Sequence, residues 1–221
     1  MEIETNAHRW LEDTRTSYDT VAASYADQVR NLRDEAPEER AVLAMFADLV
    51  SFRGGGPVVD VGCGPGRITA HLRQLGVDAY GIDLSPGMIE VARGDHPGLR
   101  FELGSMTDLD LSDGSMAGLV AWYSLIHIPD TQIGTVFENF HRVLQPGGSL
   151  LLSFHLGDAS KVKTEGYGGY PMRVHVHICQ HSQMIGWLNE AGFTVEERRT
   201  LTSAESTLGG ILLAFRQPDA Q

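Results

Sequence analysis

Short apolar runs alternate with helix-like segments through most of this sequence, and this alternation limits the possible folds more than any other feature. Several helix-like segments end at a glycine, such as Gly76 and Gly192, and Ser85-Pro86 has the residues of a helix start. Such alternation favours βαβ units, a mostly parallel sheet and helices on both of its faces. The expected strands are residues 58–61, 79–82, 99–103, 117–123, 149–154, 193–197 and 210–215.

The carboxyl ends of these strands are where a ligand is expected. In open sheets of this kind, ligands bind beyond the carboxyl ends, near the point where the strand order switches. The residues before Gly54 are expected to be helical, because apolar residues recur there at helical spacing and Pro37 with the acids after it marks a helix start. Because ligands bind at the carboxyl ends of the strands, residues that bind a ligand or take part in a reaction are expected just after Val61, Ile82, Leu103 and Tyr123.

Length and charge narrow the class of protein. The 221 residues suffice for one α/β domain with a modest cap. The 29 acidic against 17 basic residues give a net charge of −12, which disfavours a nucleic-acid partner. No apolar run approaches the ~20 residues that span a bilayer, the N-terminus lacks a signal-peptide pattern, and Cys63 and Cys179 lack a CxxC spacing. We expect a cytoplasmic monomer or homodimer with no membrane partner.

A glycine-rich loop, residues 62–66, follows the first expected strand. Glycines let a backbone turn tightly and approach a ligand closely, and Asp83, about twenty residues further on, can accept hydrogen bonds from ribose hydroxyls. A dinucleotide is the alternative ligand, but Arg67 stands where the third glycine of that motif is needed and Pro65 has no N–H for a phosphate. The charge of Asp60 beside the loop favours a cationic nucleoside instead.

The sequence resembles class I S-adenosylmethionine-dependent methyltransferases. VVDVGCGPGRIT at 58–69 looks like their first motif and GIDLSPGMIEVAR at 81–93 like their second. The match extends through GSMTDLDL, GLVAWYSLIHIP, VLQPGGSLLLSF and LNEAGF, over roughly residues 55 to 200. The resemblance implies a three-layer Rossmann-like α/β fold, a seven-stranded mostly parallel sheet with an antiparallel last strand, and S-adenosylmethionine as cofactor with S-adenosylhomocysteine as product.

The same resemblance divides the chain into three parts of one methyltransferase domain over residues 1–221. Residues 1–53 are expected to form an N-terminal helical lid, and residues 54–160 the core that binds the cofactor. Residues 161–221 are expected to supply a loop on the acceptor side and the last αβ unit.

The resemblance also implies how the cofactor is held at its methionine and ribose parts. Gly62, Gly64 and Gly66 are expected to let the loop pass beneath these parts. Asp60 is expected near the methionine amino group, and Asp83 is expected to accept hydrogen bonds from the ribose hydroxyls.

At the adenine, Leu84 and Met88 are expected to flank the base. The family often has an acidic residue at the end of the third strand, facing the adenine amino group, and this chain departs from that pattern with Ser105. Recognition is expected from the Ser105 hydroxyl and the Met106 backbone.

Aromatic residues are expected around the methyl group. Trp122 and Tyr123 end the fourth expected strand, beside the expected methyl position. The pattern Tyr18-Asp19-x-x-Ala22-x-x-Tyr25 is similar to an N-terminal signature of many small-molecule members, in which the tyrosines close over cofactor and substrate. Tyr18 and Tyr25 are therefore expected at the cofactor.

Two histidines are candidates for a general base. Methyl transfer needs alignment of the acceptor, exclusion of water and, for some acceptors, removal of a proton. His127 follows the fourth expected strand and His155 ends the fifth. Each is a candidate to position or deprotonate the acceptor, and a hydrogen-bonded loop histidine is the alternative interpretation for His127.

The segment from Lys161 to Cys179 is a candidate for the acceptor pocket or a plain surface loop. His175 and His177 alternate and so share a face of any strand there, but HxH spacing alone is weak and no metal site is expected. An arginine in this segment can hold a carboxylate or phosphate of an acceptor. The candidate acceptor-binding residues are Tyr167, Tyr170, Arg173 and His175.

Taken together, the sequence predicts methyl transfer from S-adenosylmethionine to a small molecule, with oxygen as the expected acceptor atom. Nitrogen-directed transfer, a macromolecular substrate and a non-catalytic domain that binds the cofactor are alternatives. Amino-directed nucleic-acid members carry an Asn/Asp-Pro-Pro-Tyr/Phe motif after the fourth strand, where this chain has the residues 122–125, WYSL. A nicotinamide oxidoreductase is the remaining alternative.

Overall fold

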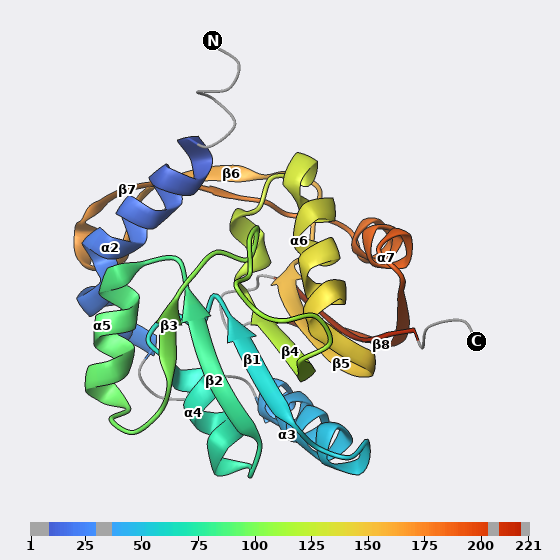
Figure 1. The fold of residues 1–221 in the computed structure, drawn as a ribbon. Helices are drawn as coiled ribbons and strands as arrows, with labels where there is room; N and C mark the ends of the chain where they lie inside the picture. Colours follow the sequence, from blue (N-terminus) through green and yellow to red (C-terminus); the bar gives the residue numbers. More distant parts are fainter. Residues whose placement is uncertain (1–8, 30–36, 203–207, 218–221) are drawn as a thin grey trace.

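A twisted sheet of seven strands forms the centre of the computed structural model, which describes residues 9–29, 37–202 and 208–217 (Figure 1). The strand order is β3-β2-β1-β4-β5-β9-β8, and β9 runs antiparallel to both β5 and β8. The seven strands and the antiparallel last strand are those expected from the resemblance. The strands are β1 (Pro57–Val61), β2 (Asp78–Asp83), β3 (Phe101–Leu103), β4 (Met116–Trp122), β5 (Leu144–His155), β8 (Phe193–Thr202) and β9 (Leu208–Arg216).

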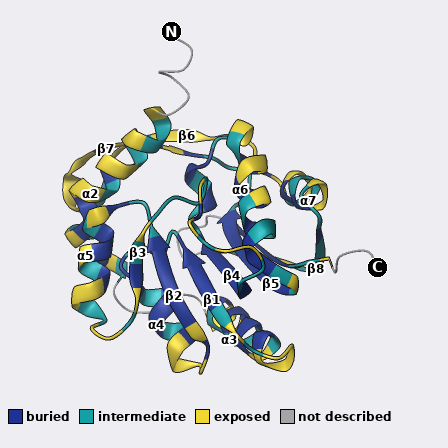
Figure 2. Ribbon diagram, viewed as in Figure 1, coloured by how far each residue is buried: buried dark blue, intermediate teal, exposed yellow. Residues whose placement is uncertain are grey.

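Helices cover both faces of this sheet. On one face, α6 (Asp130–Val143) and α7 (His181–Glu190) pack into the larger hydrophobic core; on the other, α3 (Pro37–Phe52) and α4 (Arg67–Gln74) pack into a second core. The central strand β4 is buried along its whole length and contributes alternate side chains to the two cores, as expected for a strand covered on both faces. Figure 2 shows the buried strands between helices whose outer faces are exposed.

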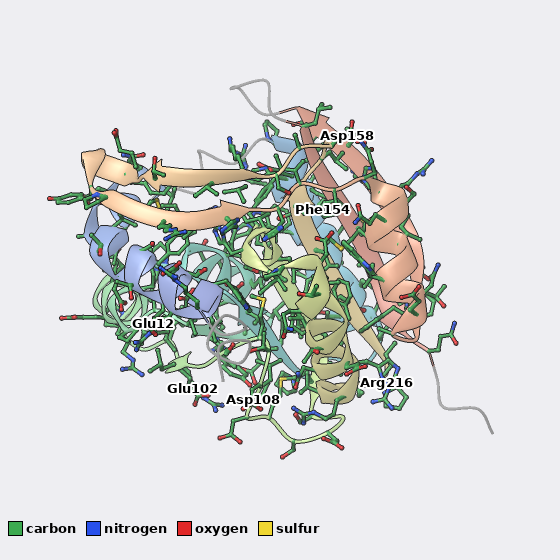
Figure 3. All side chains as sticks on the ribbon, turned by 90° about the horizontal axis from the view of Figure 1, so that it is seen from above. Glu12, Glu102, Asp108, Phe154, Asp158 and Arg216 are labelled. Carbon is green, nitrogen blue, oxygen red and sulfur yellow. The ribbon has the colours of Figure 1, made fainter. Side chains whose placement is uncertain are left out.

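A cap of two further elements crosses the carboxyl ends of the strands. It consists of the long helix α2 (Arg9–Val29) and a hairpin of β6 (Lys161–Glu165) and β7 (Pro171–Val176), joined through the 3₁₀ turn η3 (Tyr167–Gly169). Figure 3, viewed from above, shows the hairpin and α2 running across the top of the molecule. Of the segment expected to form a lid, residues 1–53, α2 lies in this cap, whereas α3 begins at Pro37, the expected helix start, and packs against the sheet.

The hairpin has its own small hydrophobic cluster with α2. Val21 of α2 packs with Met172 and Val174 of β7, and three tyrosines surround them. The Ser17 hydroxyl accepts a hydrogen bond from the Arg173 backbone N–H at 2.8 Å, and the Ser24 hydroxyl donates one to the Tyr167 carbonyl at 2.7 Å. The hairpin and α2 therefore form a single packed unit above the sheet.

Strand boundaries differ most from the sequence expectations at the end of β8, which continues to Thr202 instead of residue 197, and at the start of β5. The stretch 145–148 was expected to separate a helix from a strand, but α6 ends at Val143 and β5 begins at Leu144, which pairs with Met116. The pairing between β4 and β5 then shifts register, which accommodates the two glycines before Ser149. In the described part of the chain, no helix is long and apolar enough to cross a membrane.

Candidate active site

A pocket lies at the carboxyl ends of the first four strands, beneath α2. It encloses about 750 Å³ of space, counting its open mouth. Aromatic and apolar side chains from α2 and from the loop after β4 form its walls, together with a few polar groups. The predicted cofactor residues that line it are Tyr18, Tyr25, Gly62, Gly64, Asp83, Leu84, Met88, Ser105, Met106, Trp122 and Tyr123.

The three glycines of the loop are needed for different structural reasons. A Cβ atom on Gly62 would lie 2.3 Å from the Ser124 Cβ, and one on Gly66 would lie 2.6 Å from the ring of Phe101. A Cβ on Gly64, where φ is +53°, would meet no described atom closer than a Tyr25 ring carbon at 3.7 Å. Gly62 and Gly66 are thus required by the packing of the protein itself, whereas Gly64 leaves free space for a ligand in the pocket.

Asp83, at the end of β2, joins the two loops that border the pocket. One carboxylate oxygen accepts the Gly64 N–H at 2.8 Å, and the other accepts the Ser85 N–H at 2.8 Å. Burial raises the pKa of this carboxyl, and the two backbone N–H donors oppose that effect. Each oxygen keeps a lone pair for a further donor, so Asp83 is suited to bind a pair of ribose hydroxyls.

Asp60 lies behind the glycine loop, outside the main pocket but on a small adjoining cavity that Trp122 also lines. Its Oδ2 accepts the Thr69 hydroxyl at 2.7 Å, while its Oδ1 is buried without a hydrogen-bond partner among the described residues. Burial raises the pKa of Asp60 to about 6. The indole N–H of Trp122 is likewise buried and unpartnered in the described part of the chain.

These two unpartnered atoms test whether the site suits the expected cofactor. The Asp60 oxygen is an acceptor and the Trp122 nitrogen is a donor. They are complementary in kind to the ammonium and carboxylate of a methionine moiety, and a buried polar atom without a partner is costly unless a ligand or water satisfies it. Together with the space at Gly64 and the carboxylate of Asp83, the site fits S-adenosylmethionine.

His127 lies in the 3₁₀ turn η2 (Leu125–His127) after β4, is buried and lines the pocket. Its Nδ1 is 2.8 Å from the His175 carbonyl oxygen, so Nδ1 carries the proton and donates. Its Nε2 is 2.7 Å from the Tyr18 hydroxyl and is left to accept. Burial lowers the pKa of His127 to about 4, and burial raises that of Tyr18 well above its ordinary value, so both groups are neutral near pH 7.

His155, the second candidate base, is not among the described residues that line the pocket. Its ring lies against the Tyr123 ring, with centroids 5.3 Å apart, and burial lowers its pKa. Tyr123 has a left-handed backbone, φ 50°, and its hydroxyl donates to Glu39 at 3.0 Å. This backbone conformation is uncommon for a non-glycine residue and is often found at functional sites.

The four predicted acceptor residues are not among those that line the pocket. Tyr167 packs against Tyr25, with ring centroids 4.6 Å apart. Tyr170 is half exposed, and the exposed Arg173 side chain lies 3.9 Å from Asp13. His175 is exposed and reaches the site through its backbone carbonyl, which accepts from His127.

Several pocket contacts carried no recognisable signal in the sequence. Trp10, Leu11 and Thr14 of α2 line the pocket, and Ser124, whose hydroxyl donates to the Val61 carbonyl at 2.7 Å, packs against Gly62. The apolar spacing in α2 predicted a helix, but it did not indicate which residues of that helix would line the pocket. Among the described residues, no group of three or more His, Cys, Asp or Glu is placed to hold a metal.

The sheet order and the cap are those of the class I, Rossmann-like methyltransferase fold, and the site fits S-adenosylmethionine. Residues 58–148 match the sequence model of the family described as "Methyltransferase domain". This match covers β1 to β4, the loops that border the pocket, and the start of β5.

Individual relatives agree with this classification. The chain is 28% identical over 133 residues to a malonyl-[acyl-carrier protein] O-methyltransferase of Yersinia pestis, covering 60% of this chain and 49% of that protein. It is 32% identical over 113 residues to phosphoethanolamine N-methyltransferase 3 of Arabidopsis thaliana, covering 49% of this chain and 23% of that one. The chain thus spans about half or less of these curated relatives. Magnesium protoporphyrin IX methyltransferase from Synechocystis PCC 6803 has the same fold, with a TM-score of 0.69 and 21% sequence identity. The match covers 94% of this chain and 100% of that one.

Proposed function

We propose that this protein transfers a methyl group from S-adenosylmethionine to an oxygen atom of a small-molecule acceptor. The observation that carries the proposal is that one pocket combines the nucleoside-binding elements, Gly64 and Asp83, with a buried neutral base, His127. A domain that only bound the cofactor would not need such a base. A cytoplasmic location, and a monomeric or dimeric state, belong to the same proposal.

The cofactor, when bound, supplies a methyl group activated by a positively charged sulfur. Asp83 binds the ribose hydroxyls, and Asp60, in the adjoining cavity, balances the positive charge at the methionine end. Leu84 and Met88 pack on the adenine, beside Ser105 and Met106. Ser105 replaces the acidic residue that often binds the adenine amino group in this family. The amino group therefore binds the Ser105 hydroxyl or the Met106 backbone.

The cap excludes water and aligns the acceptor. Tyr18 and Tyr25 of α2 lie over the pocket, and Tyr167 of the hairpin packs behind them. Alignment of two reactants and removal of water are the main contributions a protein makes to a displacement of this type. Tyr167, Tyr170, Arg173 and His175 influence the acceptor through the hairpin rather than by lining the pocket.

An oxygen acceptor is favoured because the site provides a base that is already deprotonated. A neutral hydroxyl must lose its proton when its oxygen is methylated, whereas a neutral amine needs no base for the displacement. His127 is unprotonated near pH 7 because burial keeps its pKa at about 4. His155 lies beside Tyr123 and supports the methyl side of the site from outside the pocket.

Calorimetry and a methyl-transfer assay test the proposal. S-adenosylmethionine and S-adenosylhomocysteine should bind with one site per chain, and Asp83→Ala should abolish binding. Tritiated S-adenosylmethionine should then label a member of a panel of phenols, aliphatic alcohols, carboxylic acids and primary amines. Binding of NAD in place of the sulfonium nucleoside would contradict the proposal, and labelling of amines alone would replace oxygen by nitrogen.

A further inference from the structure

Both ring nitrogens of His127 are already engaged. Nδ1 donates to the His175 carbonyl at 2.8 Å, and Nε2 accepts from the Tyr18 hydroxyl at 2.7 Å. An acceptor in the pocket can therefore reach His127 only by displacing Tyr18 or by acting through it. The Tyr18 oxygen uses its hydrogen on Nε2 and keeps lone pairs to accept a further hydrogen bond.

Resting on the methyl transfer proposed above, we propose that Tyr18 relays the acceptor's proton to His127. The acceptor hydroxyl donates its hydrogen bond to the Tyr18 oxygen, and Tyr18 is thus the residue that touches the reacting atom. As the bond between the acceptor oxygen and the methyl carbon forms, the acceptor O–H bond breaks and its proton passes to the Tyr18 oxygen. The Tyr18 proton passes to Nε2 at the same time, which leaves a neutral tyrosine and an imidazolium.

The backbone of β7 holds both members of the relay. The Arg173 N–H donates to Ser17, the residue before Tyr18, and the His175 carbonyl accepts from His127. On the other side of Tyr18, the Asp19 carboxylate binds the Ser85 hydroxyl of the core. Tyr18 thus lies between Ser17, which is bonded to the hairpin, and Asp19, which is bonded to the core. These two contacts hold the Tyr18 hydroxyl beside His127.

The surroundings keep the pair neutral before the reaction and allow it to reset afterwards. Burial, and then the charges of His177, His155 and Lys163, disfavour the cationic form of His127. Burial, and then Tyr25, Tyr167 and Asp83, disfavour the anion of Tyr18. The acceptor hydroxyl becomes a very strong acid as its oxygen is methylated, so even a weak base can take its proton. The imidazolium then loses the proton readily to water because its pKa is about 4.

Nitrogen NMR tests the resting arrangement without any acceptor. In the complex with S-adenosylhomocysteine, the ¹⁵N spectrum should show His127 protonated at Nδ1 and unprotonated at Nε2. Tyr18→Phe should shift the Nε2 signal, whereas Tyr80→Phe should not, because the Tyr80 hydroxyl binds Met116 in the core, away from the pocket. A His127 protonated at Nε2 would overturn the relay while leaving the proposed function intact.

Kinetics tests the proton transfer itself, using the phenol or aliphatic alcohol of the panel that turns over fastest. Tyr18→Phe should lower kcat about 10- to 100-fold, and His127→Gln about 100-fold or more, with KM and S-adenosylhomocysteine affinity changed less than about threefold. In mixtures of H₂O and D₂O, the wild-type rate should depend quadratically on the deuterium fraction, since two protons move together. Tyr18→Phe should make this dependence linear or remove it.

The outcomes separate this inference from the proposed function. A linear dependence in the wild type, or an unchanged kcat in Tyr18→Phe, would overturn the relay and leave methyl transfer in place. Failure to bind S-adenosylhomocysteine would overturn the proposed function, although the Tyr18–His127 pair would still be seen by NMR in the free protein. Labelling of carboxylic acids alone would overturn the relay and leave methyl transfer to oxygen in place, and binding of the cofactor without labelling of any phenol, alcohol or carboxylic acid would overturn both.

Discussion

The Asp19 carboxylate of α2 and the Ser85 hydroxyl at the start of α5 (Pro86–Asp95) form a 2.5 Å hydrogen bond between the cap and the core. The same Asp19 oxygen accepts the Gly87 N–H at 2.9 Å, so it satisfies the N-terminus of α5. Ser85 also caps this helix by accepting the Met88 N–H at 3.1 Å. The cap is thus tied to the segment that follows Asp83 in the nucleoside site.

Removing this tie should make the cofactor leave faster. Asp19→Ala deletes two hydrogen bonds to a carboxylate and frees α2 on the adenine side, so we expect S-adenosylhomocysteine to dissociate about tenfold faster. Stopped-flow displacement measures this rate. Asp13→Ala on the same helix is the control, because Asp13 lies 3.9 Å from an exposed arginine and should leave the rate unchanged. Equal rates for Asp19→Ala and the wild type would show that the tie does not retain the cofactor.

Asp83→Asn should weaken cofactor binding strongly. The amide replaces one acceptor oxygen by a donor, which opposes either the Gly64 or the Ser85 N–H and loses the charge-assisted bonds to the ribose. We expect at least a 30-fold loss of S-adenosylhomocysteine affinity by calorimetry, at about 1.5–3 kcal/mol for each bond to a charged group. Asp78→Asn, at the exposed start of the same strand, is the control. An affinity within threefold of wild type would exclude Asp83 as the ribose ligand.

Asp60→Asn should raise the stability of the free protein and lower cofactor affinity. The folded pKa of about 6 exceeds the ordinary 3.8, so folding holds a proton between these values that the unfolded chain has released. The contribution of Asp60 to stability therefore falls as pH rises through pH 4–6, by up to about 3 kcal/mol, and then stays constant.

Urea unfolding of both proteins across this pH range measures the effect. The difference in unfolding free energy between Asp60→Asn and the wild type should be small at pH 4 and reach its maximum above pH 6. A difference that does not change with pH would mean that Asp60 is not a buried carboxylate with a raised pKa.

The loop glycines should separate folding from binding. Gly62→Ala places its Cβ against Ser124 at 2.3 Å and should destabilise the protein by about 1–3 kcal/mol or more. Gly64→Ala enters free space in the pocket, so it should cost about 1–2 kcal/mol from its left-handed backbone and weaken S-adenosylhomocysteine binding disproportionately. Thermal unfolding and calorimetry compare the two variants. The interpretation fails if Gly64→Ala binds the cofactor as tightly as the wild type.

The seven-stranded sheet was predictable because most of its strands are short apolar runs bounded by turn residues, a pattern that is visible locally in the sequence. Apolar runs such as 58–61, bounded by glycines, carry that information locally. The β6–β7 hairpin was expected only as a loop. Every residue of β6 is exposed or half-buried, and the alternate buried residues of β7 pack against α2, which lies far away in the sequence. Nothing in the local pattern indicates that distant partner.

The site was predictable to the extent that strand ends and residue types define it. Asp83 was identified because it ends β2 and His127 because it follows β4, and both lie at the pocket. The partners of His127 were not identifiable. Tyr18 is 109 residues away, and the His175 partner is a backbone carbonyl, which any residue type would supply. The Asp19–Ser85 pair was missed for the same reason.

The small cluster of Val21, Met172 and Val174 shares no buried side chain with the two cores of the sheet. The strand pair β6–β7 is inserted between β5 and α7 and packs mainly on α2. Substitutions in this cluster can therefore accumulate without loss of the sheet that holds the methyl donor. Replacing the hairpin would therefore be expected to disturb Tyr18 and His127 through their backbone contacts with β7, while the strand ends and the glycine loop that border the pocket stayed in place.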